Sequence, residues 1–202
     1  MRKEVLLIIL LAVAVLALLS FSQRFNPKNE DDARKFFNED LARNYPNAEN
    51  YSIYGVDKIG DGPSSYFLLK AWVRYNSSTP CPTLVEVEYY YPPQSFLRRE
   101  QTIVGNCQAC PDQPHCILLY NEEAIIASHT YDGGAQVQNY LNNHPNAKPA
   151  TRLLPAWTDS YGMEHADVWQ VDWTEAGSAD GISAFISQGQ NRILAIGPLS
   201  AQ

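Results

Sequence analysis

"NHPNAKP", residues 143–149, repeats the pattern of "NYPNAEN", residues 44–50, with Asn, Pro, Asn and Ala in register. Each stretch ends a segment in which apolar residues recur at helical spacing, because a proline disfavours helix in the residue before it. Each is followed by extended runs rich in aromatic and β-branched residues. The order of helix, proline turn and strands therefore occurs twice in the chain.

Both predicted helices are amphipathic. The first covers residues 30–46 and the second residues 133–145. Their apolar stripes are Ala33, Phe36, Phe37, Leu41 and Ala42 in the first, and Val137, Tyr140 and Leu141 in the second. Strand-like runs follow at 65–76 and 83–91, and again at 166–175 and 181–188. We expect a tandem duplication of a unit in which one helix covers one antiparallel sheet, with chance similarity of two helix ends as the alternative.

The amino-terminal segment predicts export. Residues 5–19 are apolar without a break and follow the charged "MRKE", a pattern that keeps the amino terminus inside and sends the rest outside. Residues 5–21 are close to the minimum length of a helix that crosses a membrane once. "SFS" before Gln23 also suits cleavage by a signal peptidase, which would give a secreted protein. In both cases the folded part is extracytoplasmic.

Composition narrows the choice of partners. The chain has 202 residues, a hydrophobic share of 45% and a formal net charge of −7, although its first 25 residues are net positive. The folded part is therefore acidic, which argues against a nucleic acid partner. We expect contact with the membrane only through the amino-terminal helix, and a protein or another component of the cell envelope as partner.

Three of the four cysteines lie in "NCQACPDQPHC", residues 106–116. Outside the cytoplasm, four cysteines favour two disulfides. Runs 83–91 and 98–104 predict a hairpin that turns near Gln94, which brings Cys81 opposite Cys107 at its open end. Cys110 and Cys116 then close the short proline-containing loop between them. This disulfide-stapled insertion needs little apolar core of its own.

Two other interpretations of the cysteines remain. A zinc site would use the four cysteines and His115, but Cys81 stands alone and no second ligand pair has comparable spacing. A thiol oxidoreductase would use Cys107 and Cys110, but no βαβ pattern surrounds them. We therefore predict no metal ligand and no cofactor.

Other sequence features are weaker. Asn50 in "NYS" and Asn76 in "NSS" are possible glycosylation sites. Asp172 lies between two tryptophans, as in some sugar sites, although alternation along a strand favours a solvated sheet face. Residues 89–91 are three consecutive tyrosines that cannot all face one core, so at least one is expected on the surface. No catalytic motif is present.

Residues 168–197, "VWQVDWTEAGSADGISAFISQGQNRILAIG", resemble the carboxy-terminal half of a PepSY-type domain. The wider pattern, one helix against a curved sheet, is similar to cystatin-like folds. "SQGQNRIL" departs from the acidic, glycine-containing turn usual in PepSY domains before the last strand. The resemblance implies a non-enzymatic module that restrains or assists extracytoplasmic peptidases, and it identifies no site residue.

The sequence thus predicts an α+β protein in three parts: an anchor or signal peptide in residues 1–25, a first unit with the cysteine loop in residues 26–128, and a second unit in residues 129–202. The expected function is that of a membrane-tethered binding or accessory module. The alternative is an extracytoplasmic enzyme, either a thiol oxidoreductase at Cys107 and Cys110 or a hydrolase with a dispersed site.

Overall fold

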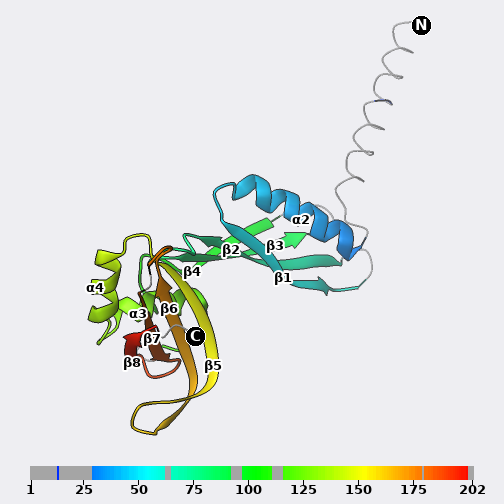
Figure 1. The fold of residues 1–202 in the computed structure, drawn as a ribbon. Coiled ribbons are helices and arrows are strands. Elements are labelled where there is room, and N and C mark those ends of the chain that lie inside the picture. Colours follow the sequence, from blue (N-terminus) through cyan, green and yellow to red (C-terminus); the bar gives the residue numbers. More distant parts are fainter. Residues whose placement is uncertain are drawn as a thin grey trace, which may run out of the picture. The chain divides into compact units, whose positions relative to one another are not determined.

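A computed structural model describes residues 13, 29–61, 65–91, 97–110, 116–178 and 180–199. The fold is α+β, as predicted, with two four-stranded sheets in the orders β1-β2-β3-β4 and β5-β6-β7-β8 (Figure 1). Its elements are α2 (Glu30–Asn44), β1 (Asn50–Ile59), β2 (Tyr66–Tyr75), β3 (Thr83–Tyr91), β4 (Leu97–Val104), α3 (Asn121–Thr130), α4 (Ala135–Asn143), β5 (Lys148–Thr158), β6 (Glu164–Thr174), β7 (Gly181–Ser187) and β8 (Ile193–Pro198).

The predicted anchor or signal peptide, apart from Val13, lies outside the described residues. Among the residues that are described, no helix combines the length and the apolar character that crossing a membrane requires. The predicted hairpin turn at residues 92–96 and most of the proline-containing loop, residues 111–115, also lie outside them.

Helix α2 begins and ends where the sequence predicts. The Asn29 side chain accepts a hydrogen bond from the Asp32 amide at 2.8 Å, which satisfies one of the free donors of the first turn. Acidic residues in that turn also favour the positive end of the helix dipole. The buried stripe is narrower than predicted, because Ala33, Phe37 and Leu41 are fully buried while Ala42 is exposed.

The first sheet carries its core on the helix side. The Phe37 and Tyr89 ring centroids lie 4.5 Å apart, and the Phe36 ring meets Tyr91 edge-on at 5.0 Å. Tyr89 and Tyr91 are buried whereas Tyr90 between them is half-buried. The expectation that three consecutive tyrosines divide between two faces is confirmed.

Two helices cover the second sheet. Helix α3 packs against β5, β6 and β7, and α4 packs against α3 and β7. In α3 every residue from Glu122 to Ser128 is buried, so this central part of the helix has no solvent face. The sequence did not predict α3, because a helix buried on all sides lacks the apolar periodicity by which helices are recognised.

The register of the second sheet explains its core. On β6, Trp169, Val171 and Trp173 point to one face, because side chains alternate along a strand. Their partners on β7 are Ile186, Ala184 and Ile182, which share that face. Both indole N–H groups are used: Trp169 donates to Leu118 O at 2.9 Å and Trp173 donates to Ser128 Oγ at 3.1 Å.

The two repeated stretches adopt similar helix ends. Tyr45 closes α2 with φ −123° and ψ 53°, and His144 closes α4 with φ −127° and ψ 72°. Each cap amide donates to the carbonyl four residues earlier, at 2.9 Å in both helices. Helix α4 buries Val137 and Leu141, whereas Tyr140 is only half-buried. All three residues of the predicted apolar stripe face the core, since Tyr140 packs against it while partly exposed.

The chain divides into two compact units. Helix α3 crosses the boundary expected at residue 128, since it extends from Asn121 to Thr130 and packs on the second sheet. Of the residues with a described placement, the first unit comprises 13, 29–46, 52–61, 65–72, 87–91 and 97–100, and the second comprises 47–51, 73–86, 101–110, 116–178 and 180–199.

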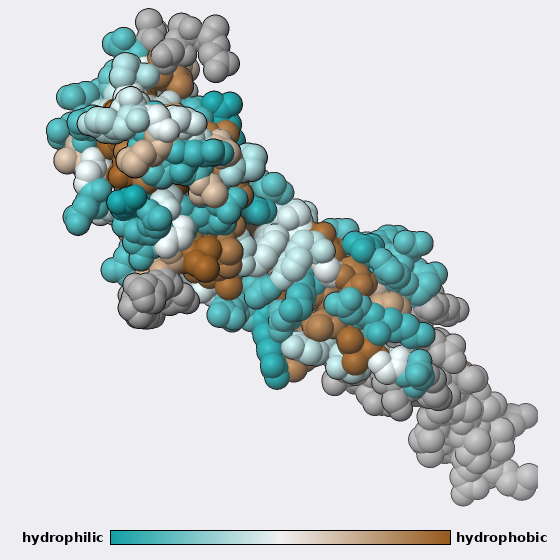
Figure 2. Space-filling model, turned by 90° about the horizontal axis from the view of Figure 1, so that it is seen from below, coloured by the Kyte–Doolittle hydropathy of each residue, from teal (hydrophilic) through white to brown (hydrophobic). Residues whose placement is uncertain are grey.

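Apolar side chains are scattered over the surface. Figure 2 shows a face on which apolar residues form separate patches among hydrophilic ones. Tyr161, at 88% the most exposed large hydrophobic residue of the described part, lies in the turn between β5 and β6, far in sequence from the next, Leu119 at 63%. Single exposed apolar residues of this kind are ordinary on a protein surface and do not by themselves indicate a binding site.

Candidate functional site: a groove between α4 and the β7–β8 hairpin

The second unit has a groove of about 490 Å³ between α4 and the β7–β8 hairpin. It exists because α4 packs against β7, while β8 at the edge of the sheet stays half-buried along most of its length. The core face of the sheet is therefore incompletely covered there. A volume of this size suits a small ligand or one large side chain of a partner.

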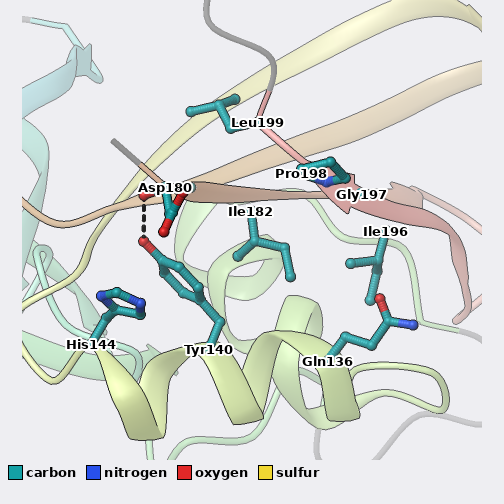
Figure 3. A pocket seen from close by; sticks show the side chains of 10 residues that line it. Gln136, Tyr140, His144, Asp180, Ile182, Ile196, Gly197, Pro198 and Leu199 are labelled. Carbon is teal, nitrogen blue, oxygen red and sulfur yellow. Dashed lines mark hydrogen bonds between the residues drawn. The ribbon is translucent and has the colours of Figure 1, made fainter. Parts of the chain in front are cut away.

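One wall of the groove is a single face of α4. Gln136, Tyr140 and His144 are spaced four residues apart, so they follow one another along the same side of the helix (Figure 3). The opposite side is apolar and comes from Ile182 on β7 and Ile196 on β8. The other lining residues are Asp180, Gly181, Gly197, Pro198 and Leu199.

Tyr140 links the helix to the sheet. Its hydroxyl donates a hydrogen bond to the Asp180 backbone carbonyl at 3.0 Å (Figure 3). Its ring stacks on the His144 ring, with centroids 4.2 Å apart and planes inclined by 22°. Burial, and then the charges of Glu175 and Asp180, raise the pKa of Tyr140 above its ordinary value. The phenol therefore stays neutral and keeps its proton as the donor.

A second contact ties the end of α4 to the β6–β7 turn. His144 Nδ1 lies 3.0 Å from Glu175 Oε2, and the Asn146 amide donates to Glu175 Oε1 at 3.2 Å. The hydrogen bond from His144, reinforced by that of Asn146, holds the pKa of the Glu175 carboxyl below its ordinary value. The ring that forms one end of the groove is thus held by a carboxylate.

This contact predicts an acid-sensitive part of the stability. As the pH falls below about 4.5, the unfolded chain takes up a proton at Glu175 before the folded chain does. The stabilisation that this contact gives the folded state is therefore lost as the pH falls through the lower pKa that Glu175 has in the folded chain. We expect Glu175→Gln to flatten the fall in the urea unfolding midpoint between about pH 5 and about pH 3. Glu164→Gln, at an exposed position of β6, serves as the control and should keep the wild-type slope. Equal slopes for wild type and Glu175→Gln would contradict the prediction.

The carboxylates at the groove are Asp180 and Glu175. Asp180 is the one Asp, Glu, Lys or Arg among the residues that line the groove, and it is exposed. Glu175 adds a second carboxylate behind His144. The groove therefore combines an apolar floor with an acidic rim, an arrangement that favours a ligand with an apolar body and a positive group.

Both predicted disulfides are present: Cys81 pairs with Cys107, with Cα atoms 4.7 Å apart, and Cys110 pairs with Cys116, with Cα atoms 5.7 Å apart. Cys107 and Cys110 thus belong to different disulfides. Strands β3 and β4 are neighbours in the sheet, as the hairpin required.

The possible glycosylation sites are both exposed. Asn50 begins β1 and Asn76 follows β2, with φ 55°. The described structure therefore leaves room for a modification at either side chain.

The exposed side of the first sheet is aromatic. The rings of Tyr54 and Trp72 stack with centroids 4.4 Å apart, and the Tyr90 hydroxyl donates to Glu88 at 2.9 Å. Glu88 also pairs with Lys70 at 3.0 Å. This side of the sheet includes Tyr90, the middle one of the three consecutive tyrosines.

Asp172 does not share a surface with the tryptophans beside it in sequence. It accepts hydrogen bonds from Gln170 Nε2 and Ser183 Oγ on one face of the sheet. Trp169 and Trp173 are buried under the helices on the other face. Neither Trp169 nor Trp173 therefore offers a platform for a sugar on the face of this carboxylate.

The residues of the groove were not predicted from the sequence, because Gln136, Tyr140, His144 and Asp180 match no motif. The four-residue spacing on α4 was their one sequence signal. No protein-family model, curated protein or solved structure matches this chain.

Proposed function

We propose that the chain is an exported binding or accessory module without catalysis, tethered to the outer side of a membrane by its amino-terminal helix. The groove between α4 and the β7–β8 hairpin carries this proposal, because it joins an apolar floor to an acidic rim. The two disulfides support export, since disulfides persist in oxidising compartments.

The ligand is a segment of a protein partner in which an apolar side chain stands next to a lysine or arginine. The apolar side chain occupies the space between Tyr140 and Ile196, and the basic group lies at the Asp180 carboxylate. The resemblance of residues 168–197 to PepSY-type domains favours an extracytoplasmic protein as this partner, because these residues include both strands of the groove.

Two copies of one helix-plus-sheet unit form the module. The similar ends of α2 and α4, and the four antiparallel strands that follow each, support an origin by tandem duplication. The two copies then have different roles, and the second, which contains α3 and the groove, is the one that binds the ligand.

Binding of short peptides to the purified chain tests the proposal. The peptides vary one central residue among Leu, Phe, Ser and Asp, and carry either lysine or glutamate beside it. We expect fluorescence anisotropy to show the tightest binding for an apolar centre flanked by lysine. Asp180→Asn should reduce the preference for lysine by about two- to fivefold, which is the contribution of one exposed ion pair.

Asp132→Asn is the matched control, because Asp132 is exposed in the same unit and does not line the groove. It should leave the preference unchanged. Binding that is indifferent to the central residue, or equal effects of the two substitutions, would reject the groove as the recognition site.

A further inference from the structure

Three segments of the second unit bring two sulfurs and an imidazole together. Cys81 lies between β2 and β3, Cys107 lies in the turn after β4, and His129 lies in the last turn of α3. Their ligand atoms are all within 4.8 Å of one another, the one such cluster of potential metal ligands among the described residues. His129 belongs to no sequence motif with these cysteines.

The imidazole is held as a metal-ligating histidine is held. His129 Nε2 lies 2.8 Å from the Pro80 carbonyl oxygen, and since a carbonyl only accepts, Nε2 carries the proton. In this tautomer the lone pair that a metal would need is on the other ring nitrogen, Nδ1. A backbone carbonyl that fixes one ring nitrogen is the usual partner of histidine ligands. The ring also packs edge-on against Trp173 at 6.4 Å, which restricts its rotation.

The disulfide is open to reduction. Cys81 is exposed and Cys107 is half-buried. A thiolate of a dithiol reductant attacks Cys81 Sγ, the Sγ–Sγ bond breaks, and Cys107 leaves as a thiolate. The second thiol of the reductant then releases Cys81 and closes the reductant's own disulfide. The protein disulfide gains two electrons, and each cysteine sulfur takes one proton.

We propose that reduced Cys81 and Cys107, together with His129, form a thiolate–imidazole site for Zn²⁺. Binding releases the two thiol protons, since thiolates are the ligands. Zn–S bonds of about 2.3 Å require the two sulfurs to move apart to roughly 4 Å once the disulfide is reduced. Three protein ligands leave the fourth tetrahedral position open to water or to another ligand. The intact disulfide excludes the metal, so reduction turns the staple into a metal site.

Cobalt titration of the full chain, before and after reduction with a phosphine, tests the proposal. We expect the oxidised chain to bind no Co²⁺, and the reduced chain to bind one equivalent with a thiolate-to-cobalt charge-transfer band that Zn²⁺ abolishes. The band should persist in Cys110→Ser/Cys116→Ser and be absent in Cys81→Ser/Cys107→Ser. His129→Gln should weaken binding by at least about tenfold.

Circular dichroism shows whether each variant is folded. X-ray absorption of the reduced, zinc-loaded wild type gives the ligand set without any substitution, and two sulfurs with nitrogen or oxygen donors are expected. Four sulfurs, no sulfur, binding to the oxidised chain, or an unchanged affinity in a folded His129→Gln variant would overturn the proposal.

Discussion

Trp173→Ala should lower the free energy of unfolding by about 3–5 kcal/mol, the usual cost of removing a large aromatic side chain from a packed core. Trp173 is fully buried at the centre of the second core and its indole N–H donates to Ser128 Oγ at 3.1 Å. The substitution removes both the ring volume and this hydrogen bond. Urea unfolding followed by far-ultraviolet circular dichroism measures the loss.

Two further variants identify the cause of the lost stability. One distinguishes the loss of ring volume from the loss of the hydrogen bond, and the other compares a buried tryptophan with a half-exposed one. Trp173→Phe keeps much of the ring and loses the N–H, so about 1–2 kcal/mol is expected. Trp72→Ala removes the same side chain from the half-exposed face of β2, where its stack with Tyr54 contributes about 0.5–1.5 kcal/mol. A loss at Trp72 equal to that at Trp173 would show that the second core is not where the stability lies.

Periodic patterns explain which elements could be predicted. Helix α2 has one buried and one exposed face, so the four-residue spacing of Ala33, Phe37 and Leu41 predicted it from the sequence. Helix α3 is buried on all sides and gives no such pattern. Strands β1 and β5 also escaped prediction, although they follow the proline turns directly. Both form an edge of their sheets, and most of their residues are exposed or half-buried, so apolar content did not mark them.

Spatial proximity explains what was missed at the sites. The disulfides followed from the geometry of one hairpin, because Cys81 and Cys107 are symmetric about its turn. His129 reaches the same place from α3, a helix that was not predicted. The groove likewise depends on α4 lying over β7 and leaving β8 half-covered, which is a property of packing. Local sequence patterns therefore predicted residue pairs that lie within one helix, strand or hairpin. They did not predict contacts between elements that are distant in the sequence.

A second large loss of stability is expected on breaking a buried ion pair of the second unit. Arg74 Nε lies 2.8 Å from Glu122 Oε1, and the Glu122 side chain is only 1% exposed. Its other oxygen, Oε2, has no hydrogen-bond partner among the described residues. The guanidinium, itself 24% exposed, is thus the one strong partner of a buried carboxylate.

Arg74→Ala should therefore cost about 3–5 kcal/mol in urea unfolding, because it leaves a buried carboxylate without its counter-charge. Arg34→Ala is the matched control: Arg34 and Glu30 on α2 are also 2.8 Å apart, but their side chains are 42% and 53% exposed. An exposed helical pair contributes only about 0.3–0.5 kcal/mol, since water solvates both partners. Arg74→Met/Glu122→Gln should recover most of the loss, because it removes both buried charges together. Similar costs at Arg34 and Arg74, or a double variant as unstable as Arg74→Ala, would show that the burial of Glu122 does not set the strength of this contact.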